Sequence, residues 1–320
     1  MDHHIVWMKE NALKEPVTLR VVACGDVVSI LRSGPIPIGS NGSTMEIEYR
    51  LYAKRDSLQV SCFVNWMEKH KTLRYELSTQ YRGDVARYGA PFNFVDRSQV
   101  PQTQKEEGQW EVPASRWASV LDGSGNGLSI ITQSKYGYRA KMGVLSFTLL
   151  RSSTFPDPTA DQGKHTIQFA ISKHQNSFLH NTDTGDLIIP TAAKADELFA
   201  KPVVLSSYDT SLLPKPFIHF ISLGSVVPSW VMPSTSENHR GNSFCIRLHE
   251  VSGCNTDILF SILRLDDKMT NVETVNFNEK CLSELEATSS DDIGDQEGRL
   301  CYNLTIGAYK IVTVRISYTS

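Results

Sequence analysis

Leu58-Gln59-Val60-Ser61-Cys62-Phe63-Val64-Asn65-Trp66 decides the fold class. Every second residue of this stretch is apolar, which is the period of an extended strand with one face on a core. The same alternation recurs at 17–21 and 45–52. Further strands, rich in β-branched and aromatic residues, are predicted at 127–132, 144–150, 165–171, 217–223, 244–249, 257–263 and 310–318. The pattern predicts an all-β protein.

Turn-forming residues separate the predicted strands. Ser40-Asn41-Gly42-Ser43 predicts a hairpin turn with a positive φ, and 121–127 is a glycine-rich loop. The two prolines of Phe155-Pro156-Asp157-Pro158 favour an extended, stiff connection. One helix is predicted at 190–199, where strong helix formers follow a proline. The proline-rich stretch 206–241 is predicted to be irregular, apart from the strand at 217–223.

Length and composition describe an ordinary globular chain of about two domains. The chain has 320 residues, of which 40% are apolar and 21% charged. Since the strands resume after the proline-rich stretch, we expect one β domain at 1–205 and a second at 206–320.

Charge and cysteine usage exclude several classes of protein. The net charge is about −3, so the chain offers no overall basic character for nucleic acid. No apolar run approaches the roughly 20 residues of a membrane-spanning helix. The first residues lack a secretion signal, and six dispersed cysteines without a CxxC pair suit a reducing compartment. These features predict a cytoplasmic protein that binds neither nucleic acid nor membranes.

One polar loop is the best candidate for chemistry. Arg151, Asp157, Asp161 and His165 lie in or beside the Pro-bracketed loop, and together they are polar enough to bind a ligand. Ion pairs and Asx turns that merely hold the loop explain the same residues equally well. No zinc-protease or nucleophile-elbow motif is present, so no metal or catalytic nucleophile is predicted within this chain.

Two tyrosines in a nearby hairpin are candidates for stacking on a sugar ring. They flank a glycine in Tyr136-Gly137-Tyr138, and that glycine indicates a backbone that another group approaches closely. Burial in a core is the alternative, because it is the commoner fate of aromatic residues in strands.

Five motifs, in order, carry a resemblance to family 38 glycoside hydrolases. The segment 126–138 resembles the family's "yGlallNdskYGyd", and 145–166 resembles "LrLsLLRSPtyPDp.aDrGrH". Upstream, 64–74 is similar to "vdWhErhklLk" and 110–117 to "fevPAhrW". Downstream, 246–253 is similar to "lRlyE.sG". The sequence departs from these patterns at Gln133, Ser134, Gln162 and Lys164.

The resemblance is to the C-terminal half of these α-mannosidases. It implies a large galactose-mutarotase-like β-sandwich, truncated at its front because the family's first strands precede Trp7, and then a smaller Ig-like β-sandwich. The family hydrolyses terminal α-linked mannose with retention, using an Asp nucleophile and zinc in an N-terminal barrel. Neither the "GHaHiDtaW" zinc motif nor the nucleophile segment occurs in this chain, so no catalytic or zinc residue carries over.

The resemblance leaves three functional readings open. In the first, the chain supplies support and part of a carbohydrate pocket to a catalytic barrel, with Arg151, Asp157, Asp161, His165, Tyr136 and Tyr138 lining that pocket. Its partners are then a mannose-containing oligosaccharide and the barrel. In the second, it is a stand-alone carbohydrate-binding or interaction module. In the third, it is an independent hydrolase that uses Asp157 and Asp161.

Overall fold

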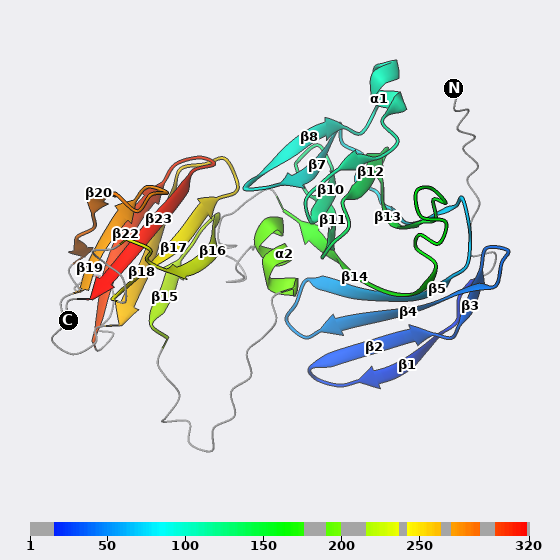
Figure 1. Cartoon of the computed structure of the whole chain (residues 1–320), viewed down its shortest axis with the longest axis horizontal. Helices are drawn as coiled ribbons and strands as arrows, with labels where there is room; N and C mark the ends of the chain where they lie inside the picture. The colour runs from blue at the N-terminus through cyan, green and yellow to red at the C-terminus, as the bar shows by residue number, and fades with distance from the viewer. Residues whose placement is uncertain are drawn as a thin grey trace. The chain divides into compact units, whose positions relative to one another are not determined.

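The computed structural model describes residues 16–175, 190–199, 216–236, 242–263, 270–288 and 298–318. Their secondary structure is almost entirely antiparallel strands, with two helices in the described ranges, which confirms the all-β prediction (Figure 1). The chain divides into two compact units: 1–89 with 95–176, and 90–94 with 177–320. The predicted domain boundary between 205 and 206 lies outside the described residues.

A ten-stranded antiparallel sheet dominates the first unit. β3 (Ile36–Ile38) pairs with β4 beside the main path of the sheet. The remaining strands follow the order β1 (Leu19–Cys24), β2 (Val28–Ser33), β4 (Ser43–Tyr52), β5 (Ser57–Trp66), β14 (Gly163–His174), β11 (Gly127–Thr132), β10 (Trp117–Leu121), β7 (Val85–Ala90) and β8 (Asn93–Ser98).

A four-stranded sheet packs on this larger sheet and closes the core. Its order is β6 (Thr72–Ser78), β13 (Val144–Arg151), β12 (Gly137–Lys141) and β9 (Val112–Pro113). Phe147 of β13 is fully buried, and its ring lies 4.9 Å, centroid to centroid, from that of Phe169 in β14. The apolar residues of β5, including Val60 and Val64, belong to the same core. The alternation at 58–66 therefore faces one layer of a β-sandwich.

The turn at 40–43 and the glycine-rich loop at 121–127 are present where the sequence predicts them. Gly42 has a φ of +81° in the turn between β3 and β4. In the β10–β11 hairpin, the Asp122 carboxylate accepts the backbone N–H of Ser124 at 2.8 Å and that of Asn126 at 3.0 Å. The short helix α1 (Gln104–Gly108) was not predicted, although Thr103 and Glu106 form a capping box at its start.

The second unit is a smaller sandwich of two antiparallel sheets. One has the order β15 (Ile218–Ser222), β18 (Thr256–Leu263), β22 (Arg299–Ile306) and β21 (Ala287–Thr288). The other has the order β16 (Val226–Pro233), β17 (Ser243–Glu250), β23 (Ile311–Tyr318), β19 (Thr270–Val275) and β20 (Cys281–Glu284). Phe260 and Ile316 are among the buried residues that fill its core.

One secondary-structure prediction for this unit was wrong. The stretch 206–241 was expected to be irregular outside 217–223, but β16 is an eight-residue strand that includes Pro228 and Pro233. β16 lies at an edge of its sheet and its register shifts between Pro228 and Trp230. Edges and bulges are the places where a strand tolerates proline.

The predicted helix is present as α2 (Thr191–Phe199). No helix in the described ranges is long and apolar enough to cross a membrane.

Candidate functional site

Four connections of the first unit meet at the ends of its strands. They are the turn at 39–42, the β5–β6 loop at 67–71, the β11–β12 loop at 133–136 and the β13–β14 loop at 152–162, and we call them the loop cluster. Hydrogen bonds join the turn at 39–42, the β5–β6 loop and the β13–β14 loop, although these are up to 94 residues apart in the sequence. The β11–β12 loop is bonded to the end of β13, next to the β13–β14 loop. Most of the sequence-predicted site residues lie in this cluster or next to it.

Glu68 holds two of these loops together. Its side chain has no exposed surface, and Oε1 accepts the backbone N–H groups of Ser40 at 2.9 Å and Asn41 at 2.7 Å. Oε2 lies 2.9 Å from the Lys71 Nζ. Burial raises the pKa of the Glu68 carboxyl, but hydrogen bonds from Lys71, Asn41 and Ser40 outweigh burial and lower the pKa to about 2. Glu68 is therefore ionised and fully bonded at neutral pH.

Gly39 fits closely against the same carboxylate. A Cβ on Gly39 would lie 2.5 Å from the Glu68 Oε1, and its φ is +69°. Only glycine combines that backbone conformation with so close an approach.

Backbone bonds extend the β6–β13 pairing into the cluster. The Ser152 carbonyl accepts the His70 N–H at 2.7 Å, and the Ser152 N–H donates to the Lys71 carbonyl at 3.1 Å. The buried Ser152 hydroxyl donates to that carbonyl at 2.8 Å and accepts the Lys71 N–H at 3.3 Å. At the other end of the loop, Gln162 Nε2 donates to the Glu68 carbonyl at 2.5 Å. The β13–β14 loop is thus fixed at both ends.

Asp161 brings Arg151 and His165 together through the backbone. Its Oδ2 accepts the Arg151 N–H at 2.6 Å, and its carbonyl accepts from His165 Nε2 at 2.9 Å. Among the described residues, the exposed Arg151 guanidinium forms no ion pair with Asp157 or Asp161. The loop is held by carboxylate-to-backbone bonds, and the Arg151 charge remains available at the surface.

Asp157 is committed to its own turn. Its Oδ1 accepts the backbone N–H and the hydroxyl of Thr159, both at 2.8 Å. These bonds lower the pKa of the exposed Asp157 carboxyl. Asp157 and Asp161 therefore accept hydrogen bonds from different backbone segments, those of Thr159 and Arg151.

The two tyrosines have different environments. Tyr136 is 60% exposed, whereas Tyr138 has no exposed surface and its hydroxyl lies 2.6 Å from the Thr132 Oγ1. Gly137 between them is approached closely, since a Cβ there would lie 1.7 Å from the Glu111 Oε1. Tyr136 is an exposed residue of the loop cluster, and Tyr138 belongs to the core.

The neighbouring Lys135 ties the β11–β12 loop to strand β13. Its Nζ donates to the Leu149 carbonyl at 2.6 Å. Burial lowers the pKa of Lys135, and the nearby Asp161 carboxylate opposes that shift. A lysine held in this way adds positive charge close to Asp161.

Sequence reasoning did not single out Glu68 or Phe155. Phe155 is 86% exposed within the β13–β14 loop, and Met67 is 45% exposed in the β5–β6 loop. The sequence signal for Phe155 is an aromatic residue directly before a proline in a polar loop. With Tyr136, these side chains give the loop cluster an exposed apolar component.

We expect Ser152→Ala to destabilise the first unit by about 1–2 kcal/mol, because the hydroxyl of the buried Ser152 and its two bonds to the Lys71 backbone are lost. Urea unfolding followed by tryptophan fluorescence measures the change, since Trp66 and Trp117 are both buried in this unit. Ser153→Ala changes an exposed neighbour and is the matched control. Equal stability of the two variants would contradict the bonding role of Ser152.

Within the described ranges, no group of three or more His, Cys, Asp or Glu side chains is arranged to hold a metal ion. The chemistry that the loop cluster offers is recognition: a free guanidinium, carboxylate and carbonyl acceptors, and exposed aromatic rings.

Comparison with known proteins gives consistent matches. Residues 8–159 match the family described as "Glycosyl hydrolases family 38 C-terminal domain". The chain is 32% identical to human "Alpha-mannosidase 2C1" over 195 residues, which are 61% of this chain and 18% of that protein. It is 25% identical to "Alpha-mannosidase G" of Dictyostelium discoideum over 263 residues, covering 78% of this chain and 23% of that protein.

A solved structure shares the fold. The crystal structure of an α-mannosidase from Enterococcus faecalis V583 superposes with a TM-score of 0.70 at 13% identity, covering 93% of this chain and 35% of that one. The chain spans about a fifth of the length of the curated relatives that it matches.

Proposed function

Because residues 8–159 belong to the C-terminal domain of the family 38 glycosyl hydrolases, we propose that this chain acts as the C-terminal region of an α-mannosidase. In this proposal it gives structural support and part of a carbohydrate pocket to a catalytic region that lies outside the chain. The enzyme as a whole removes terminal α-linked mannose from oligosaccharides.

The exposed side chains of the loop cluster are the observation that supports this proposal. The loop cluster is fixed from within by Glu68 and Ser152, yet it presents the Arg151 guanidinium and the 86% exposed Phe155 outward. A rigid loop that exposes a cation and a large aromatic residue is suited to contact a second surface or a sugar. The catalytic region is the partner that fits this surface best.

Zinc, in this proposal, is bound by the catalytic region and not by this chain. The zinc would act there as a Lewis acid. This chain would contribute hydrogen bonds and charge to the sugar from Arg151, Asp157, Asp161, His165 and Tyr136. The buried Tyr138 would support the hairpin that carries Tyr136. A cytoplasmic location for the assembled enzyme remains a prediction from the sequence.

We expect the purified 320-residue chain to show no turnover of an aryl α-mannoside, with or without added zinc, because its sequence contains neither the zinc motif nor the nucleophile segment of the family. When the chain is joined to a family 38 catalytic region, Arg151→Ala should lower kcat/KM at least about tenfold and leave the Tm unchanged. Arg20→Ala, at an exposed position of β1, is the control.

Two outcomes would replace the proposal. If the isolated chain binds a mannose oligosaccharide tightly and gains no activity from a catalytic region, it is a stand-alone module. If the isolated chain shows turnover that Asp157→Ala abolishes, it is an independent hydrolase.

A further inference from the structure

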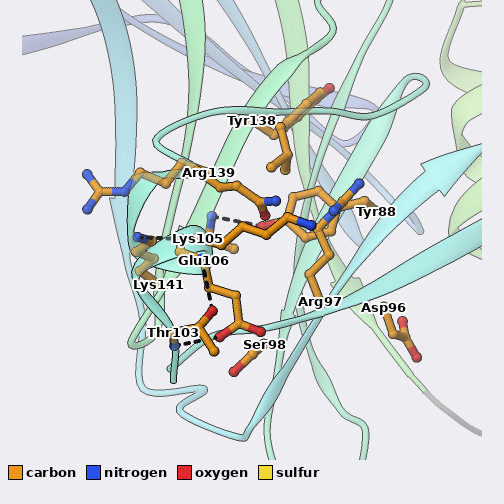
Figure 2. Close-up of a pocket in the computed structure, with 13 residues that line it drawn as sticks. Tyr88, Asp96, Arg97, Ser98, Thr103, Lys105, Glu106, Tyr138, Arg139 and Lys141 are labelled. Carbon is orange, nitrogen blue, oxygen red and sulfur yellow. Dashed lines mark hydrogen bonds between the residues drawn. The ribbon is translucent and has the colours of Figure 1, made fainter. Parts of the chain in front are cut away.

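A second concave site lies in the first unit, on the side of β8, α1 and β12. It is a cavity of about 350 Å³ whose lining includes Arg97, Lys105, Arg139 and Lys141 (Figure 2). Arg97 comes from β8, Lys105 from α1, and Arg139 and Lys141 from β12. Three elements therefore place four cations around one cavity, in a chain whose net charge is about −3.

The carboxylates in this lining are already committed to other groups. Asp96 accepts two hydrogen bonds from the Arg87 guanidinium, at 2.9 and 3.0 Å. Glu106 accepts the backbone N–H of Gln102 at 2.7 Å and that of Thr103 at 3.2 Å, as part of the α1 capping box. Neither carboxylate forms an ion pair with one of the four cations in the described part of the chain. The cavity therefore keeps an excess of positive charge.

Two of the cations have buried donors without acceptors. The Nε atoms of Arg97 and Arg139 are both inaccessible, and neither bonds an acceptor among the described residues. A buried charged donor left without an acceptor is costly, so such atoms indicate a missing partner. The Arg97 guanidinium carbon lies 5.8 Å from the centre of the Tyr88 ring (Figure 2).

The remaining contacts hold the cations in place without neutralising them. The Arg139 guanidinium lies over the Trp110 ring at 4.5 Å, and Lys141 Nζ lies 5.9 Å from the same ring. Lys141 Nζ also donates to the Glu107 main-chain carbonyl at 3.3 Å. Burial lowers the pKa of Lys141, the charge of Arg139 lowers it further, and Glu107 opposes both. Stacking and carbonyl contacts orient these side chains but leave their charges uncompensated.

We propose that this cavity binds the phosphate group of a small ligand. A phosphate monoester carries a charge of about −1.5 to −2 at pH 7 and three strong acceptor oxygens. A phosphate therefore suits the two guanidinium and two ammonium groups of this cavity better than a carboxylate ligand, which has a single charge and two acceptor oxygens. The cavity is large enough for a phosphate and an attached sugar-sized group. The site is separate from the loop cluster and does not depend on the α-mannosidase role.

Calorimetric titration of the whole chain with inorganic phosphate, at pH 7 and low ionic strength, tests the site. We expect saturable binding that Arg97→Gln and Arg139→Gln each weaken at least about tenfold, the loss expected for one charge-assisted hydrogen bond. Arg20→Gln removes the same charge from β1, at the opposite edge of the ten-stranded sheet, and should change the affinity less than about twofold. Circular dichroism tests whether each variant is folded. If an arginine variant fails to fold, Lys141→Gln is titrated in its place.

Titrations with other ligands distinguish a phosphate ester from free phosphate. A hexose 6-phosphate that binds more tightly than inorganic phosphate would identify a phosphate ester as the occupant, and equal affinities would identify the phosphate group alone. Acetate that binds as tightly as phosphate would overturn the proposal. So would the absence of saturable binding by the folded wild-type chain, or an Arg20→Gln variant as weak as Arg139→Gln.

Discussion

Replacing Glu68 by Gln is expected to lower the free energy of unfolding of the first unit by roughly 3 kcal/mol at pH 7. The pKa of Glu68 falls from an ordinary 4.5 to about 2, and each unit corresponds to about 1.4 kcal/mol. A glutamine amide keeps one acceptor oxygen but turns an N–H₂ group toward the donors of Ser40 and Asn41 or toward Lys71. The loss therefore includes a charge and the acceptor geometry that holds two loops together.

The pH dependence follows from the sign of the same shift. The pKa of Glu68 is lower in the folded state, so the unfolded chain binds the proton first as the pH falls. The contribution of Glu68 is complete above about pH 4.5 and is lost as the pH falls through about 2. Between those limits, the stability difference between the wild-type chain and Glu68→Gln should shrink with decreasing pH.

Urea titrations at pH 7, 4.5 and 3, read by tryptophan fluorescence, measure this difference. Glu107→Gln makes the same substitution at an exposed position of the first unit and is the control at each pH. A difference that stays constant from pH 7 to 3 would show that the Glu68 charge does not contribute. A control as unstable as Glu68→Gln would show that the loss is not specific to the loop cluster.

Periodicity predicted the strands in which one face is buried. β5 has apolar residues at every second position from 58 to 66, and its structural bounds, Ser57–Trp66, extend the predicted stretch by one residue. β11 has the predicted bounds, 127–132, and the helix α2 begins one residue after its predicted start. These elements are visible in the sequence because burial of a single face or a run of strong helix formers determines them locally.

Elements defined by their neighbours were harder to predict. β16 contains two prolines, and only its position at a sheet edge makes it a strand. α1 is five residues long and buries no side chain, so its capping box was its one sequence signal. Local propensity carries little information in either case.

The candidate site was predicted in composition but not in geometry. The sequence grouped Arg151, Asp157 and Asp161, and the first and last of these do interact. The bond joins a carboxylate to the Arg151 backbone N–H and not to its guanidinium, which a residue pattern does not distinguish. Glu68 was missed because its bonding partners in the 39–42 turn lie 27 and 28 residues away in the sequence.

The largest expected loss of stability is in the second unit, at Arg315. Arg315 in β23 lies directly opposite Glu273 in β19, and both side chains are almost completely buried. Its Nε and Nη2 lie 2.9 and 2.8 Å from the Glu273 Oε1, and its Nη1 donates to the Glu279 carbonyl at 2.8 Å. Arg315→Met therefore leaves a buried carboxylate without its cation, which typically costs about 3–5 kcal/mol.

A double variant separates the cost of a broken pair from the value of the pair itself. Replacing both charges by apolar residues of similar volume is often neutral or stabilising, so Arg315→Met with Glu273→Leu should recover most of the loss. Because the chain has two units, amide hydrogen exchange in β19 and β23 is the suitable measurement, and it reports the second unit alone. Exchange in Arg315→Met should approach that of the unfolded unit, whereas the double variant should retain protection. Equal protection in wild type and Arg315→Met would contradict a structural role for the buried pair. A double variant no more protected than Arg315→Met would mean that the ion pair does not hold β23 in place, and that the contact with the Glu279 carbonyl does.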